Sequence, residues 1–197
     1  RSGSRGRRSH LPSLIFGTAG IHDGQFNMPR EVGFSPDGRE LYLLDRSHRV
    51  QVFDTSGRFL RMWPTPFGPL GNPRGLDVAP DGTLYVADTH NSQILEYSPQ
   101  GKLRRRFGRG GKGPGEFTSV TDVALDSRGN LWACEYGNYN DRIQKLDPRG
   151  RPILALGRFG SKPGEFSRPQ GLAVDREDRL YVADAVNHRI QIISPEG

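Results

Sequence analysis

The chain has 197 residues, 28 of them Lys or Arg and 22 Asp or Glu, with 26 glycines, 15 prolines and one cysteine. This length suits one domain with a sizeable core. The single Cys134 excludes a disulfide within the chain, and no apolar run approaches the roughly 20 residues of a membrane-spanning helix. The composition therefore indicates a turn-rich globular domain and leaves the redox compartment open.

The net charge of +6 is unevenly distributed. Residues 1–10 hold four basic side chains and residues 102–112 hold six, with no acidic residue in either segment. The rest of the chain is therefore slightly acidic. We expect residues 1–10, rich in Ser, Gly and Arg, to be a disordered basic tail or linker. The segment 102–112 offers a polyanion or RNA contact, although solvated surface charge is the simpler interpretation.

From residue 11 onward, short strand-like runs alternate with turns. Residues 11–17 read as a lone strand, and four similar units follow at about 29–63, 73–107, 119–157 and 169–197. Their aligned positions Glu31, Gly75, Thr121 and Gly171 lie 44, 46 and 50 residues apart. A period in the forties with several short strands per unit is typical of a β-propeller.

Each unit shares the same second and third strands. The second is apolar on both faces, as a blade buried between neighbours requires, and it ends in a carboxylate. The third begins with Arg in three units and with Gln93 in the other. Opposite charges facing each other across a hairpin predict a structural clamp on the loop. The clamp residues are Asp45, Arg49, Asp88, Glu135, Arg142, Asp184 and Arg189.

Residues 187–190 read NHRI, and residues 140–143 read NDRI. With weaker copies at 47–50 and 91–94, they resemble the signature of NHL repeats, so Asn187 and His188 join the structural motif. The resemblance covers about residues 11–197 and implies an all-β, NHL-type propeller of four-stranded antiparallel blades. Because such propellers usually have six blades, we expect an open arc or fragment. The alternative is a closed four-bladed ring in which residues 11–16 pair with 189–194.

Antiparallel order places the loops between second and third strands at the same end as the connections between blades. We call this end the top face. Its longest hairpin loop, residues 136–140, follows the basic connection 108–115. Cations interleaved with aromatic rings can stack on and neutralise a ligand. The candidate ligand-binding residues are Arg109, Lys112, Tyr136, Asn138 and Tyr139, and ordinary surface loops are the alternative.

Catalytic signals are few. The glycine run at 108–115 lacks the Gly-Lys-Ser/Thr and helix of a phosphate-binding loop, so we interpret Gly-x-Phe as the turn between blades. Neither HExxH nor CxxC occurs. His48, His90 and His188 lie in or near corresponding top-face loops of different blades. Amidating lyases, which resemble NHL propellers, use a metal bound by histidines. Their motif has no residue-by-residue match here, so we predict no catalytic residue, metal or cofactor.

These observations predict a non-enzymatic binding or scaffold module that presents its top-face loops to a protein. Two alternatives stay open. The resemblance implies RNA binding, as in the NHL propellers of developmental RNA regulators, although the acidic blades argue against it. It also implies a metal-dependent lyase or hydrolase similar to amidating lyases. An exported bacterial protein, periplasmic or at the cell surface, is favoured over a cytoplasmic one, because the tail would tether the domain after loss of an export signal.

Overall fold

The computed structural model describes residues 12–67 and 73–197. The expected disordered tail at residues 1–10 lies outside the described residues. Apart from two short 3-10 helices, η1 (Thr89–Asn91) and η2 (Ala185–Asn187), the regular elements described are all β-strands. The all-β prediction is therefore confirmed.

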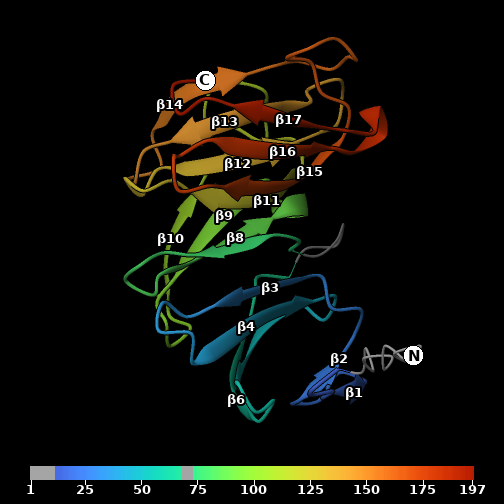
Figure 1. Ribbon diagram of the computed structural model, residues 1–197, viewed down its shortest axis with the longest axis vertical. Coiled ribbons are helices and arrows are strands. Elements are labelled where there is room, and N and C mark those ends of the chain that lie inside the picture. The colour runs from blue at the N-terminus through green and yellow to red at the C-terminus, as the bar shows by residue number, and fades with distance from the viewer. Residues whose placement is uncertain (1–11, 68–72) are drawn as a thin grey trace, which may run out of the picture.

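Four antiparallel sheets follow one another along the chain and stack as the blades of a propeller (Figure 1). In each blade the strands pair in chain order, which gives a simple meander. The first two blades contain β3 (Glu31–Phe34), β4 (Glu40–Asp45), β5 (Arg49–Asp54), β6 (Phe59–Pro64), β7 (Leu76–Val78), β8 (Leu84–Asp88), β9 (Gln93–Tyr97) and β10 (Leu103–Phe107). The last two contain β11 (Val120–Leu125), β12 (Leu131–Glu135), β13 (Arg142–Leu146), β14 (Pro152–Leu156), β15 (Pro169–Val174), β16 (Leu180–Asp184) and β17 (Arg189–Ile193).

The turns at the bottom of the blades explain the recurrent Asp and Gly. Asp54 accepts hydrogen bonds from the Ser56 hydroxyl at 2.6 Å and from the Arg58 amide at 3.0 Å. These bonds lower the pKa of Asp54 to about 2. Gly57 then takes a φ of 81°, a left-handed conformation that glycine adopts without strain. Short polar turns of this kind fix the strand register.

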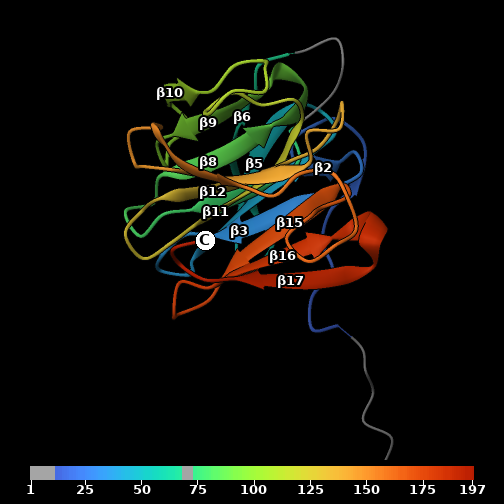
Figure 2. The same cartoon turned by 90° about the horizontal axis from the view of Figure 1, so that it is seen from above.

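The core lies between the sheets, because neighbouring blades pack face to face. One cluster, including Trp63 and Tyr97, joins the first and second blades, and another, including Phe117, joins the second and third. A third cluster surrounds Trp132 and Phe166. Figure 2 shows β3, β11 and β15 towards the middle of the molecule, with β10 and β17 at its periphery.

A repeated contact sets the distance between blades. In the first two blades, the last aromatic residue of the outer strand packs on a glycine of the next blade, in the turn that follows the third strand there. Trp63 lies against Gly101, and Phe107 lies against Gly150, where a Cβ atom would overlap each ring. Both glycines also have positive φ, 85° and 81°. These positions therefore require glycine twice over, for conformation and for space.

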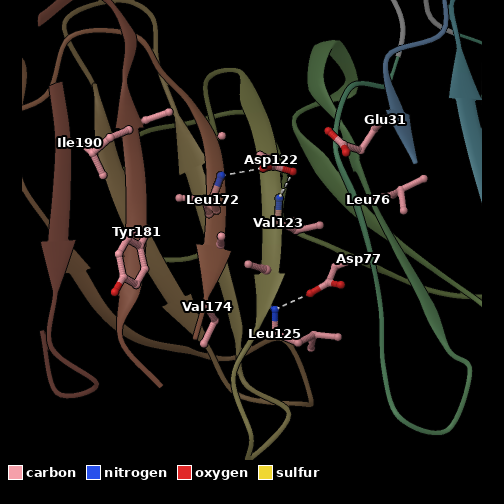
Figure 3. Close-up of a pocket in the computed structure, with 14 residues that line it drawn as sticks. Glu31, Leu76, Asp77, Asp122, Val123, Leu125, Leu172, Val174, Tyr181 and Ile190 are labelled. Atoms are coloured by element: carbon pink, nitrogen blue, oxygen red, sulfur yellow. Dashed lines mark hydrogen bonds between the residues drawn. The ribbon is translucent and has the colours of Figure 1, made fainter. Parts of the chain in front are cut away.

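Carboxylates tie the inner strands together. The Asp77 carboxylate accepts the Leu125 amide at 2.8 Å, and Asp122 accepts the Leu172 amide at 2.7 Å (Figure 3). Both line a cavity of about 530 Å³ beside the inner strands, together with Glu31. Burial raises the pKa of all three carboxyls, and that of Asp122 reaches about 7 because the charges of Glu31 and Asp77 add to the effect of burial.

The arc is open, as expected. Among the described residues, β17 pairs with β16 alone, and the side chains of Ile190 and Ile192 are 61% and 58% exposed. Phe16 instead packs against Phe26 and Phe53 in the first blade. The closed four-bladed ring is therefore wrong for this structure.

The lone strand expected at residues 11–17 is wrong over its described part, 12–17. No β-strand is formed there, and the next residues form the short parallel pair β1 (Thr18–Ala19) and β2 (Gln25–Phe26). Phe16 nevertheless packs on Gly57, as Trp63 packs on Gly101. The side-chain contact of a fourth strand is therefore kept, but no neighbouring strand supplies backbone partners to residues 12–17.

The raised pKa of Asp122 predicts a pH-dependent stability. An unfolded Asp loses its proton near pH 4, whereas folded Asp122 keeps its proton up to about pH 7. The raised pKa therefore stabilises the folded state fully below about pH 4, and this stabilisation is lost as the pH rises towards 7. The ceiling of the effect is about 4 kcal/mol in the free energy of unfolding. Urea denaturation at several pH values should show Asp122→Asn with a flatter dependence than the parent between about pH 4 and pH 7. Asp23→Asn, in an exposed loop, is the control, and equal slopes for Asp122→Asn and the parent would contradict the assignment.

Candidate functional site

A buried carboxylate at the top of the last blade anchors the connection that precedes it. The Asp184 side chain is fully buried, and Arg189 Nε donates to its Oδ2 at 2.8 Å. The two terminal nitrogens of the same guanidinium donate to the carbonyls of Ser161, Lys162 and Glu165, each at 2.7 Å. One arginine thus makes an ion pair and three backbone bonds, which fixes the loop in place.

The third blade repeats this arrangement. Arg142 Nε donates to the fully buried Glu135 at 2.8 Å, and the arginine side chain is only 11% exposed. Its terminal nitrogens donate to the carbonyls of Lys112 at 2.7 Å, Gly113 at 2.8 Å and Glu116 at 3.0 Å. The glycine-rich connection is therefore held by the same fork of donors as the next one.

The first two blades use weaker forms of the clamp. Arg49 and Asp45 are both buried, but their closest nitrogen and oxygen are 3.4 Å apart. Arg49 also donates to the Gln25 carbonyl at 2.9 Å. In the second blade, Gln93 donates to Asp88 at 2.8 Å, so a neutral amide takes the place of the guanidinium.

Sequence reasoning missed a glutamine two residues after each clamp arginine. Gln144 donates to Glu135 and accepts the Gly115 amide, at 2.8 and 2.9 Å. Gln51 and Gln191 accept corresponding glycine amides at 3.0 Å. The signal was present as Arg-x-Gln in the first, third and fourth repeats.

The other motif residues also serve the loops. Asn187 donates to Asp184 at 2.9 Å and to the Gly160 carbonyl at 2.8 Å. His188 has a φ of 54°, and its amide donates to the Ala185 carbonyl at 3.3 Å, which ends the short helix η2. The tetrapeptide at 187–190 therefore supplies a loop anchor, a left-handed turn and a clamp in succession.

The structure brings four of the five candidate ligand residues together. Lys112 Nζ donates to the Asn138 carbonyl at 2.8 Å. Tyr139 is 81% exposed, and its ring meets Phe159 edge-to-face with centroids 5.2 Å apart. Asn138 and Tyr139 both have positive φ, 52° and 58°, which is uncommon for consecutive non-glycine residues. Observed backbone strain of this kind motivates a functional hypothesis.

Tyr136, the fourth of these residues, lies under a cation from the last blade. The guanidinium of Arg168 is 4.8 Å from the centre of the Tyr136 ring. The Arg168 amide donates to the buried Asp141 at 2.6 Å, which joins the two top-face loops. We call this shared area the rim surface; it comprises Lys112, Tyr136, Asn138, Tyr139, Phe159 and Arg168.

Arg109 stands apart, because it forms an ion pair with Glu116 at 2.9 Å. The Glu116 carboxylate also accepts the Gly113 amide at 2.9 Å, and the two contacts lower its pKa. The Glu116 carboxylate thus binds the backbone amide that a phosphate-binding loop would offer to its ligand. Phe117, the end of the Gly-x-Phe turn, is fully buried in the core.

The basic segment 102–112 does not act as one patch. Its residues 103–107 form the outer strand β10, where Arg105 pairs with Glu96. Lys112 lies in the connection above, beside Asn138. The charges are therefore divided between the blade's outer edge and the top face.

The histidines of corresponding loops do not converge. The His48 ring packs against Phe67 at 5.0 Å, and His188 ends η2. Residues 12–67 and 73–197 contain no group of three or more side chains able to hold a metal ion together. In the same part of the chain, no helix is long and apolar enough to cross a membrane.

Two family matches agree with this architecture. The NHL repeat family matches residues 166–193, which contain the Asp184–Arg189 clamp, and a family described as a 6-bladed beta-propeller matches residues 70–134. The chain contains an NHL repeat and has a β-propeller fold. The Asp184–Arg189 clamp and the tetrapeptide 187–190 thus lie within the matched NHL repeat.

Curated relatives of the NHL-repeat chain match it in part. NHL repeat-containing protein 3 of Homo sapiens is 28% identical over 102 residues, which cover 46% of the chain and 29% of that protein. Protein brain tumor of Drosophila melanogaster is 26% identical over 95 residues, 47% of the chain and 9% of that protein. The chain therefore spans less than a third of these relatives' length.

Solved propellers superpose on most of the NHL-repeat chain. A streptogramin B lyase structure gives a TM-score of 0.68 at 19% identity, covering 91% of the chain and 54% of the lyase. Virginiamycin B lyase from Staphylococcus aureus gives 0.64 at 20% identity, with 84% and 52% covered. At this identity the likeness shows the propeller fold alone.

Loss of one clamp arginine should destabilise its blade. Arg189→Ala removes the partner of a buried carboxylate and three bonds to the neighbouring loop. We expect the free energy of unfolding to fall by about 1–3 kcal/mol. Thermal melting should show this against Arg176→Ala, an exposed arginine in a bottom turn. Equal melting temperatures for the two variants would contradict a stabilising clamp.

Proposed function

We propose that the chain is a non-enzymatic binding module that receives a protein partner on its rim surface. The observation that carries this proposal is the exposed aromatic pair Tyr139–Phe159, flanked by Lys112 and by Arg168. Exposed aromatic and arginine side chains are the residue types that dominate binding energy at protein interfaces.

The rim surface is preorganised by the clamps below it. Arg142 binds the Lys112 carbonyl, while the Lys112 side chain binds the Asn138 carbonyl. On the other side, Arg189 holds the connection that follows Phe159 through the carbonyls of Ser161 and Lys162. Loops already fixed in position lose little conformational freedom on binding, which favours affinity.

Mixed charge around the rim favours a protein over RNA. Arg109 pairs with Glu116, and Arg158 pairs with Glu165, both at 2.9 Å. A phosphate backbone would bring negative charge against both carboxylates. A protein surface can instead place an apolar group on the aromatic pair and opposite charges on each ion. A lyase function, by contrast, would rest on likeness of fold alone.

Peptide selection provides a direct test. Random peptides displayed on phage would be selected on the immobilised chain, and the enriched peptides would be measured by calorimetry. We expect the variant Tyr139→Ala with Phe159→Ala to weaken their binding by roughly tenfold or more, because it removes the aromatic anchors.

The control variant is Phe34→Ala with Ile192→Ala, which removes exposed apolar side chains from strands away from the rim. Equal weakening of peptide binding by both variants, or no enrichment of peptides, would contradict the proposal. Saturable binding of a single-stranded RNA oligonucleotide with a steep salt dependence, lost in the rim variant, would assign the surface to RNA instead.

A further inference from the structure

A second polar pocket lies on the top face, at the entry to the inner strands. Its volume is about 200 Å³, and Arg30, Arg74, Thr121 and Gln170 line it together with Glu31 and Asp122. The first four residues occupy the same position in successive repeats. The strand register aligns Asp122, not the expected Thr121, with Glu31 and Gly171, because these three residues pair with Cys134, Leu44 and Ala183 respectively. Thr121 therefore corresponds to Arg30, Arg74 and Gln170. Each blade therefore presents one polar residue at this mouth, which we call the axial pocket.

Two arginines of the axial pocket are without an acidic partner. Clamp arginines such as Arg142 and Arg189 bind carboxylates and carbonyls. Within residues 12–67 and 73–197, by contrast, the side chains of Arg30 and Arg74 neither donate a hydrogen bond nor form an ion pair. Residues 1–11 and 68–72 contain no Asp or Glu in their sequence, so they supply no carboxylate either.

The backbone fixes where these two arginines project. The Arg30 amide donates to the Leu44 carbonyl at 2.8 Å, and the Arg74 amide donates to the Ala87 carbonyl at 3.0 Å. Both bonds join the entry of an inner strand to the second strand of its own blade. Two rigid blades therefore bring two cations to one small pocket.

The basic groups at the mouth lower one another's pKa values. Burial lowers the pKa of Arg30, and the neighbouring guanidiniums of Arg74 and Arg46 lower it further. Burial also lowers the pKa of His90, again with contributions from Arg74 and Arg30. Several basic groups are thus held close enough to disfavour one another's charge, which an anion between them would relieve.

The carboxylates in the wall are already engaged by backbone amides. Glu31 accepts the Val32 amide at 3.2 Å. Asp122 accepts the Leu172 amide at 2.7 Å and the Val123 amide at 2.9 Å. Glu31 thus binds an amide of its own strand, and Asp122 binds amides of its own and of the neighbouring inner strand. Within the described part of the chain, no ion pair joins either acid to Arg30 or Arg74.

We propose that the axial pocket is an oxyanion site in which Arg30 and Arg74 bind one carboxylate or phosphate group. Guanidinium groups match the geometry of both anions through paired N–H donors. The small volume suits a single such group. The site is distinct from the rim surface and does not depend on a protein partner there.

A titration of the full chain tests this site. Amide NMR spectra would be followed as inorganic phosphate, or in a second series acetate, replaces chloride at constant ionic strength. We expect saturable shifts at Gly75 and Thr121, which line the pocket. The anion that binds more tightly identifies whether the natural group is a phosphate or a carboxylate.

The variant Arg30→Gln with Arg74→Gln should weaken that binding by roughly tenfold or more, because it removes both charged donors. Its melting temperature without the anion should be equal to or above that of the parent, since a repulsion is removed. Arg149→Gln with Arg176→Gln, in bottom turns, lowers the net charge equally and should bind as the parent does.

Two results would overturn the proposal. One is the absence of saturable shifts in the parent with either anion, a result that does not depend on any variant folding. The other is equal weakening by the axial and control variants, which would reveal only a general charge effect. Because no peptide is present, neither result bears on the rim surface.

Discussion

The buried carboxylate at the top of each blade is the constraint on which the rest of the top face depends. A charge removed from water must be compensated by close partners. In the third and fourth blades, the compensation comes from Arg142 and Arg189, whose remaining donors bind the connection between blades. The same arginine therefore neutralises the carboxylate and fixes the loop. The same geometry converts a rigid stack of sheets into a rigid set of surface loops.

Local spacing in the sequence carried much of this information. The repeat period, the carboxylate at the end of the second strand and the arginine that begins the third all follow from short-range patterns. The glutamine of Arg-x-Gln was equally periodic, but its amide donates to a carboxylate and accepts from a glycine of a distant connection. Its role becomes clear only when the connection between blades is placed above the strand.

The rest of the candidate site could not be predicted, because it combines residues from different blades. Phe159 and Arg168 join Tyr139 and Tyr136 across a blade boundary, and no periodicity specifies which loops meet there. Arg30 and Arg74 are 44 residues apart in the chain. Arg109 is separated from the rim for a different reason, because Glu116, seven residues later in the same connection, folds back and pairs with it.

Amide hydrogen exchange tests most directly whether a clamp arginine holds its loop. In the parent, the hydrogen-bonded amides within residues 109–117 should be protected. They are those of Gly111, Gly113, Gly115, Glu116 and Phe117, and that of Phe117 donates to the Arg109 carbonyl at 2.8 Å. Arg142→Lys keeps the charge but loses the fork of donors. The account predicts faster exchange across residues 109–117 in this variant, with protection of β12 unchanged. Equal exchange of the loop in the parent and Arg142→Lys would contradict the account.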